Sequence, residues 1–169
     1  MMQNSRKKNI ILIGMPGSGK TTIGTLLADK LNCMFMDSDQ LIIQKTGKTP
    51  KQIVEEKGRE FFLSIQDEVI LEIKGNEFVL STGGGIVHSD LAMGYLKSIG
   101  YIIYLNTEYK IIEERMDESR KLVRTNGSLQ DLYNERIPLY LKYADEILDC
   151  NYIDPQLLCE KIMVLMNSV

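Results

Sequence analysis

The chain has little of what marks a membrane protein, a secreted protein or a nucleic-acid-binding protein. No apolar run approaches the ~20 residues needed to cross a bilayer, so no membrane partner is expected. With 20 Lys and Arg against 23 Asp and Glu, the net charge is −3, which argues against a polyanion-binding surface and a nucleic acid partner. The basic residues at 6–8 lack the apolar segment and cleavage site of a signal peptide. We therefore expect a cytoplasmic protein.

Cysteine and histidine are scarce as well. The three cysteines, at 33, 150 and 159, are odd in number and do not have metal-ligand spacing, so we expect buried thiols rather than a zinc or redox site. His88 is the only histidine, and a capping or surface role is favoured over ligand contact. We also find no internal repeat, low-complexity tract or linker, so residues 1–169 are expected to form a single domain.

What the chain does have is a regular alternation of apolar strand-like runs and longer helical patterns. Strands are predicted at 9–14, 34–37, 77–81, 101–105 and 146–150. Helices are predicted near 20–31, 39–46, 50–57, 59–74, 89–98, 107–117, 128–144 and 155–167. This alternation predicts an α/β fold, with a five-stranded parallel sheet covered by helices on both faces.

A complete phosphate-binding motif, G-x-x-x-x-G-K-[ST], lies between the first strand and the first helix. Such a turn aims backbone N–H groups and a helix N-terminus at one point, which suits a polyphosphate. Lys20 would reach the β- and γ-phosphates and the Thr21 hydroxyl would hold Mg²⁺. The alternative is a glycine-rich turn without a ligand, which the flanking strand and helix argue against. The predicted nucleotide-binding residues are Gly14, Met15, Pro16, Gly17, Ser18, Gly19, Lys20, Thr21 and Thr22.

Two further segments follow predicted strands and should lie at the same edge of the sheet, because ligands bind at the carboxyl ends of parallel strands. Asp37 and Asp39 can divide two tasks there, one orienting Mg²⁺ and the other accepting a proton from a hydroxyl. Helix capping by Ser38 or Asp39 is the structural alternative. Residues 83–85 are three glycines, which allow a substrate close to the backbone, although a plain flexible turn is also possible.

Arginines late in the chain are candidate contacts for anionic groups of the substrates. Residues 117–127 are charged and weakly periodic, as expected of a connector or of a lid, in which Arg120 could offset charge on a transferring phosphoryl group. Arg136 precedes Pro138 in a helical pattern, where a kink could aim a guanidinium at a carboxylate. A solvated arginine is the alternative for each.

Together these motifs resemble the shikimate kinase family, within the nucleoside-monophosphate-kinase-like P-loop kinases. The resemblance covers about residues 9–165, and its pieces are G-M-P-G-S-G-K-T-T-I-G, F-M-D-S-D, T-G-K-T-P-K-Q-I-V-E-E-K-G, L-S-T-G-G-G, S-R-K-L-V and E-R-I-P-L-Y-L-K-Y-A-D. It implies a three-layer P-loop kinase fold, with a lid near 117–127 and acceptor-binding helices near 39–74. It also implies ATP as donor, Mg²⁺ as cofactor and a small-molecule acceptor, and we expect a monomer.

The resemblance also implies roles for individual residues. Asp37 would support the metal through water, and Asp39 would bind the acceptor's hydroxyls and act as the base. Arg120 matches the lid arginine, although Lys121 replaces the usual proline, and Arg115 is a weaker match to an adenine contact. The residues implied at the acceptor are Asp39, Gly83, Gly84, Gly85 and Arg136.

The departures from the family cluster in residues 59–66. Leu63 stands where the family has a carboxylate-binding arginine, Gln66 where it has a glutamate, and Arg59 where it has another glutamate. Arg59 lies one helical turn before Leu63, which gives the hypothesis that its guanidinium replaces the missing one and binds the acceptor. This hypothesis predicts that Arg59→Ala raises the KM for shikimate much more than the KM for ATP.

The sequence thus favours an ATP- and Mg²⁺-dependent kinase, with Lys20, Asp39 and Arg120 as catalytic residues and the 3-hydroxyl of shikimate as the first candidate acceptor. The altered segment keeps a second hypothesis open, a kinase of the same fold acting on another small hydroxy compound. A third is a nucleotide-binding homologue without catalytic activity.

Overall fold

One parallel sheet holds all five strands of the computed structural model, which describes residues 9–116 and 127–169. The sheet order is β2-β3-β1-β4-β5, and every neighbouring pair is parallel. The strands are β1 (Asn9–Ile13), β2 (Met34–Asp37), β3 (Phe78–Ser81), β4 (Gly100–Asn106) and β5 (Glu146–Asp149). The predicted five-stranded parallel sheet is therefore confirmed.

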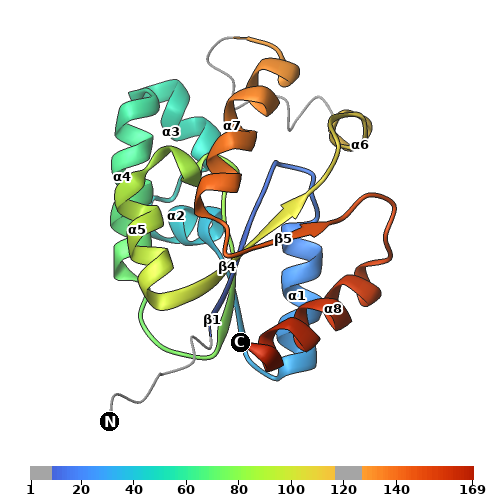
Figure 1. Cartoon of the computed structure of the whole chain (residues 1–169). Helices are drawn as coiled ribbons and strands as arrows, with labels where there is room; N and C mark the ends of the chain where they lie inside the picture. The colour runs from blue at the N-terminus through green and yellow to red at the C-terminus, as the bar shows by residue number, and fades with distance from the viewer. Residues whose placement is uncertain (1–8, 117–126) are drawn as a thin grey trace.

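Helices cover both faces of this sheet (Figure 1). On one face, Ile11 and Ile13 of β1 belong to a core cluster with residues of the middle helices and α7. On the other face, Ile10 and Leu12 pack with α1 and α8. The helices are α1 (Lys20–Leu31), α2 (Ser38–Thr46), α3 (Pro50–Lys57), α4 (Arg59–Glu72), α5 (Asp90–Ile99), α6 (Tyr109–Arg115), α7 (Leu129–Tyr143) and α8 (Pro155–Ser168). Alternate side chains of the central strand thus face opposite helical layers, as expected of a three-layer α/β fold.

One local detail is not predicted from the sequence: a short 3₁₀ helix, η1 (Ile86–His88), follows the three glycines directly. Helix α7 continues through Pro138, as expected from the helix predicted at 128–144. The segment 117–126, which includes most of the predicted lid, lies outside the described residues.

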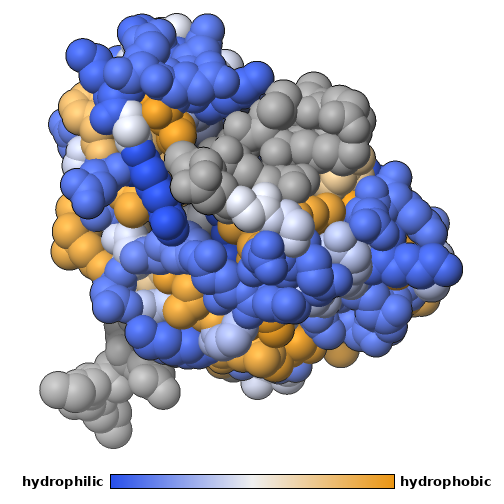
Figure 2. Space-filling view, turned by 90° about the horizontal axis from the view of Figure 1, so that it is seen from above, coloured by the Kyte–Doolittle hydropathy of each residue, from blue (hydrophilic) through white to orange (hydrophobic). Residues whose placement is uncertain are grey.

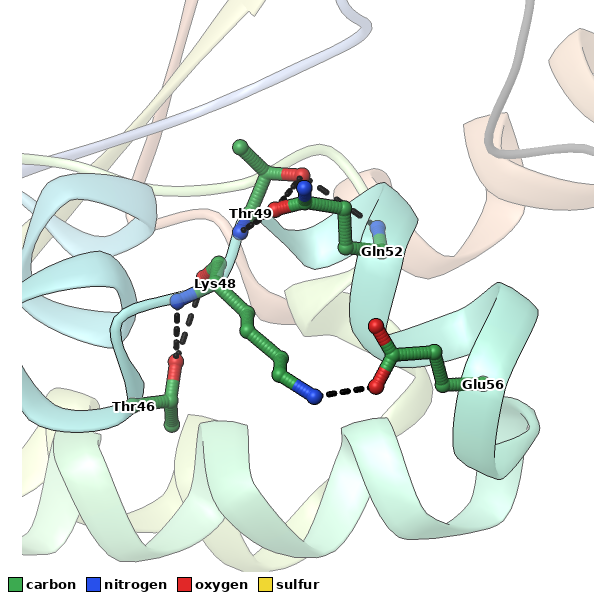
Figure 3. A network of polar contacts seen from close by, with 5 residues as sticks. All are labelled: Thr46, Lys48, Thr49, Gln52 and Glu56. Carbon is green, nitrogen blue, oxygen red and sulfur yellow. Dashed lines mark hydrogen bonds and ion pairs between the residues drawn. The ribbon is translucent and has the colours of Figure 1, made fainter.

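The junction between α2 and α3 is fixed by short-range polar contacts (Figure 3). The Thr49 hydroxyl accepts a hydrogen bond from the Gln52 N–H at 3.2 Å, and the Gln52 side chain accepts one from the Thr49 N–H at 2.9 Å, forming a capping box. Thr46 accepts from the Lys48 N–H at 3.2 Å, and Lys48 pairs with Glu56. These contacts set the angle at which α3 leaves α2, beside the site described below.

The carboxyl ends of the strands point toward the top of Figure 1, where α6 and α7 also lie. Figure 2 looks down on this end, and hydrophilic residues predominate there, with hydrophobic residues in small separate groups between them. Within the described residues, no helix has both the length and the apolar character that crossing a membrane would require.

Candidate active site

The phosphate-binding motif forms a tight loop between β1 and α1. Gly14, Gly17 and Gly19 all have positive φ, at 151°, 84° and 92°. At Gly14 a Cβ would also lie 2.9 Å from the Leu105 carbonyl oxygen, so a larger residue would displace the loop from β4. Helix α1 begins at Lys20, directly after the last of these glycines. The loop therefore presents backbone N–H groups and a helix N-terminus together, which is the arrangement that binds phosphate groups.

Lys20 is held against its own loop. Its side chain is buried, and its Nζ donates to the carbonyl oxygens of Gly14 and Met15, each at 2.8 Å. The Thr21 side chain lies beside this group and donates to Oδ2 of Asp37 at 3.3 Å. The predicted phosphate contact and the predicted metal-supporting carboxylate are thus adjacent, although their segments are far apart in the sequence.

Asp37 uses its two carboxylate oxygens for two purposes. Its Oδ1 accepts hydrogen bonds from the N–H groups of Asp39, at 2.9 Å, and Gln40, at 3.3 Å, so Asp37 is the N-cap of α2. Its Oδ2 is the oxygen that faces Thr21. The helix cap is therefore neither Ser38 nor Asp39, and the Ser38 hydroxyl instead accepts from the Gly83 N–H at 2.8 Å.

Asp39 lies in the first turn of α2, close to the three glycines. A Cβ on Gly83 would be 2.7 Å from its Oδ1. Burial, and to a smaller extent the negative charge of Asp37, raise the pKa of the Asp39 carboxyl to about 6, while Lys20 opposes the change. At neutral pH this carboxylate is ionised but holds a proton more strongly than an ordinary aspartate, which suits a general base.

The three glycines make room for the side chains of the site. A Cβ on Gly84 would be 2.7 Å from Cδ of Pro16 and 2.9 Å from Nη1 of Arg136, and one on Gly85 would be 3.2 Å from Nη2. None of the three has a positive φ. Steric clearance around Asp39 and Arg136, rather than backbone freedom, is therefore what requires glycine here.

Arg136 comes from α7, and its guanidinium lies over Gly84 and Gly85. The residue is 8% exposed, and its Nε has no hydrogen-bond partner among the described residues. Tyr140, one turn later, donates to the Gly84 carbonyl oxygen at 2.6 Å and stacks on Tyr104. Burial raises the pKa of Tyr140, so its hydroxyl remains a donor. Tyr140 thus ties α7 to the glycine segment, a role that sequence reasoning missed although Tyr140 lies within the quoted R-I-P-L-Y stretch.

One cavity of about 740 Å³ brings these groups together. Pro16 to Thr22 of the phosphate loop line it at one side, and Asp39, the three glycines and Arg136 line it at another. Gly14 and Met15 do not line the cavity but hold Lys20 from behind. The predicted residues that do line it are Pro16, Gly17, Ser18, Gly19, Lys20, Thr21, Thr22, Asp37, Asp39, Gly83, Gly84, Gly85, Arg115 and Arg136.

The remaining candidate residues have different positions. Arg115 lines the cavity and donates through Nη1 to the Gly17 carbonyl oxygen at 3.1 Å. Arg59 does not line the cavity; its half-exposed side chain has Nη2 3.8 Å from Oε1 of Glu135. Arg120 lies outside the described residues. Ser89, not His88, caps α5, and the partly exposed His88 has Nε2 3.4 Å from the same Glu135 oxygen.

The departing residues of α4 have different surroundings from one another. Leu63 packs against a small apolar cluster that includes Ile42 and Ile53. Gln66, in contrast, lines the cavity. Its Nε2 has no hydrogen-bond partner among the described residues, which is visible only once the neighbouring elements are placed.

Known proteins with the same architecture identify the family. The chain matches the family model described as "Shikimate kinase" over residues 16–167. The chain belongs to the shikimate kinase family. A shikimate kinase of Clostridium botulinum (strain Eklund 17B / Type B) is 38% identical over 145 residues, covering 84% of this chain and 87% of that protein. The shikimate kinase of Caldicellulosiruptor bescii is 36% identical over 162 residues, covering 92% and 94%.

A solved shikimate kinase supports the same assignment. The enzyme from Acinetobacter baumannii in complex with shikimate superposes with a TM-score of 0.89 at 33% identity, covering 95% of this chain and 93% of that one. The resemblance stated from the motifs and the three-layer kinase fold that it implies are therefore confirmed.

Proposed function

We propose that this protein is an ATP-dependent kinase that transfers the γ-phosphoryl group to a hydroxyl of shikimate, giving shikimate 3-phosphate. One observation carries the proposal: a single cavity joins the phosphate loop to Asp39 and Arg136, which meet on the three glycines. Family membership and the shikimate complex of a relative support shikimate as the acceptor.

The donor side of the reaction uses the loop and Lys20. The loop N–H groups and the N-terminus of α1 bind the phosphates, and Lys20 exchanges its carbonyl partners for phosphate oxygens when ATP enters. Charge on the transferring phosphoryl group is thereby offset, and most of the catalysis is positioning and electrostatic stabilisation.

The residues also fit a magnesium ion. Thr21 and Asp37 place a hydroxyl oxygen and a carboxylate oxygen together at the edge of the loop, and oxygen ligands are what Mg²⁺ prefers. Among the described residues, no cluster of three or more His, Cys, Asp or Glu side chains could hold a metal by itself. A site completed by ATP phosphates and water is the usual arrangement for Mg²⁺, which when bound neutralises phosphate charge.

The acceptor side supplies a base and a cation. Asp39 accepts the proton of the attacking hydroxyl, a role that its raised pKa of about 6 allows at neutral pH. Arg136 binds the carboxylate of the acceptor, because its guanidinium fork matches a carboxylate and its Nε has no partner among the described residues. Gly83 to Gly85 keep both side chains close to the acceptor.

Further roles follow from the sequence. Arg120 would offset charge on the phosphoryl group, and Arg115 would contact the nucleotide from its place beside Gly17.

A cytoplasmic monomer is the expected form, and light scattering of the purified protein checks its oligomeric state.

A coupled assay of ADP release tests the proposal, with shikimate and a panel of other hydroxy acids and polyols as acceptors. We expect saturable, shikimate-dependent release of ADP at a rate that exceeds the rate without acceptor.

A second candidate function is a kinase of another small hydroxy compound. It is favoured by the position of Leu63 in an apolar cluster and of Arg59 beside Glu135. Preferential turnover of another panel member would select it, and tight ATP binding without turnover of any acceptor would contradict both.

A further inference from the structure

Gln66 is a buried polar side chain on the cavity wall. The residue is 1% exposed, and its Nε2 has no hydrogen-bond partner among the described residues. Folded proteins pair the great majority of buried donors, because an unpaired one loses its hydration without replacement. Gln66 nevertheless lines the cavity that holds the proposed active site. A buried, unpaired donor at a cavity wall is a candidate contact for a bound molecule.

Helix α4 presents only one side of itself to the cavity. Within the described residues, Phe62 and Gln66 are its contributions to the wall, as expected for positions i and i+4 on one helical face. Leu63 and Ile65 do not line the cavity and pack against the apolar cluster to which Phe62 also belongs. The wall formed by α4 therefore offers an aromatic ring and one amide.

The charges around the cavity limit what the amide can bind. Arg136 is a buried cation on the glycine segment. Lys51 of α3 also lines the cavity, but its side chain is 40% exposed and its Nζ lies 3.8 Å from Glu55. Asp39 accepts the proton of the reacting hydroxyl in the proposed function. On the acceptor side, the buried Nε of Arg136 and Nε2 of Gln66 have no partner among the described residues, so both suit a substituent that only accepts hydrogen bonds, such as a carboxylate.

We propose that Gln66 determines acceptor specificity: its Nε2 donates a hydrogen bond to a carboxylate oxygen of the acceptor, beside the guanidinium of Arg136. This inference rests on the proposed function. A neutral amide and one buried guanidinium suit an acceptor with a single negative charge.

Two substitutions at position 66 test the contact by steady-state kinetics with shikimate and ATP. Gln66→Met keeps the length of the side chain but removes the donor, so we expect the KM for shikimate to rise about three- to tenfold, as for a lost hydrogen bond. Gln66→Glu places a negative charge beside the carboxylate without the arginine that the family has at position 63, so its KM should rise by more than about tenfold. The KM for ATP should stay within about twofold in both.

Controls separate binding from folding. Ser64→Ala changes an exposed residue of the same helix, whose hydroxyl donates only to the Phe61 carbonyl oxygen, and should leave both KM values unchanged. Thermal melting identifies a variant that is merely unstable. The methyl ester of shikimate lacks the charge, so Gln66→Glu should impair turnover of the ester less than that of the acid.

Several results would overturn the inference. They are an unchanged KM for shikimate in both variants, equal effects on shikimate and ATP with a lowered melting temperature, and a larger effect of Lys51→Ala than of Gln66→Met. Wild-type turnover of shikimate is the separate check on the proposed function. If shikimate fails but another hydroxy acid is phosphorylated, the same comparison made with that acid decides the role of Gln66. If no hydroxy acid is phosphorylated, both are overturned.

Discussion

The donor half and the acceptor half of the cavity are built in different ways. In the donor half, Lys20 and Thr21 already have protein partners, and the loop that holds them is one continuous segment. In the acceptor half, side chains arrive from α2, α4 and α7, and the buried nitrogens Arg136 Nε and Gln66 Nε2 have no partners among the described residues. A phosphate loop formed by backbone groups is compatible with many acceptors. The residues of the acceptor half are therefore the ones that determine the acceptor of this chain.

The largest effect is expected from Asp39, which lies where the two halves meet. Asp39→Asn removes the proposed base while keeping the shape of the side chain, so kcat should fall by about 10²- to 10⁴-fold. The KM for ATP should change little. Steady-state assays measure both values, and a loss of less than about fivefold would contradict the role of Asp39 as base.

The same variant should be more stable than the wild type. Because the pKa of Asp39 is raised from 3.8 to about 6, its ionised form is disfavoured in the folded state. Ionisation therefore lowers the free energy of unfolding by about 1–3 kcal/mol above pH 6, and by less as the pH falls toward the unfolded pKa. Thermal melting of Asp39→Asn should show a gain at about pH 7.5 that disappears near about pH 4. The wild-type kcat/KM should decline below about pH 6.

Arg115 and Arg136 both line the cavity and allow a direct comparison of the halves. Arg136→Met removes the proposed charge-assisted contact to the acceptor, so the KM for shikimate should rise about ten- to a hundredfold. Arg115→Met changes the donor half and should raise the KM for ATP instead. Steady-state kinetics measures the KM for shikimate and the KM for ATP in both variants. Equal changes of the two KM values in each variant would show that the two halves do not act separately.

Two glycine-to-alanine substitutions test whether residues 83–85 must be glycine because neighbouring side chains leave no room for a Cβ. Gly84→Ala would place a methyl group 2.7 Å from Pro16 Cδ and 2.9 Å from Arg136 Nη1, so Arg136 must move. The KM for shikimate should rise about three- to tenfold, with a smaller change for ATP. Gly94→Ala is the matched control, because a Cβ there meets nothing within 4 Å. Equal kinetics in both variants would remove the steric explanation.

The smallest effect is expected for Arg59. The side chain is half exposed, lies 3.8 Å from Glu135 and does not line the cavity, and exposed ion pairs contribute little. Arg59→Ala should therefore raise the KM for shikimate by less than about threefold. A rise above about tenfold, with the KM for ATP unchanged, would instead support compensation for the missing arginine.

The same division explains what the sequence could predict. The strands, the phosphate loop and Asp37 are local signals, so the sheet and the donor half follow from short stretches. Contacts between distant elements leave no local signal. The hydrogen bond of Tyr140 to Gly84, the clearance that Gly83 gives Asp39 and the unpaired amide of Gln66 all depend on how α7, α2 and α4 pack. The acceptor side therefore needed the structure.

The central claim is that one cavity binds both substrates and transfers the phosphoryl group between them. The stoichiometry of the wild-type reaction tests this claim most directly. Purified protein is incubated with ATP, Mg²⁺ and shikimate, and ADP and phosphorylated shikimate are quantified together by mass spectrometry. We expect equimolar ADP and shikimate 3-phosphate. ADP formed with free phosphate, or no ADP at all, would contradict the proposal that this cavity transfers phosphoryl groups to shikimate.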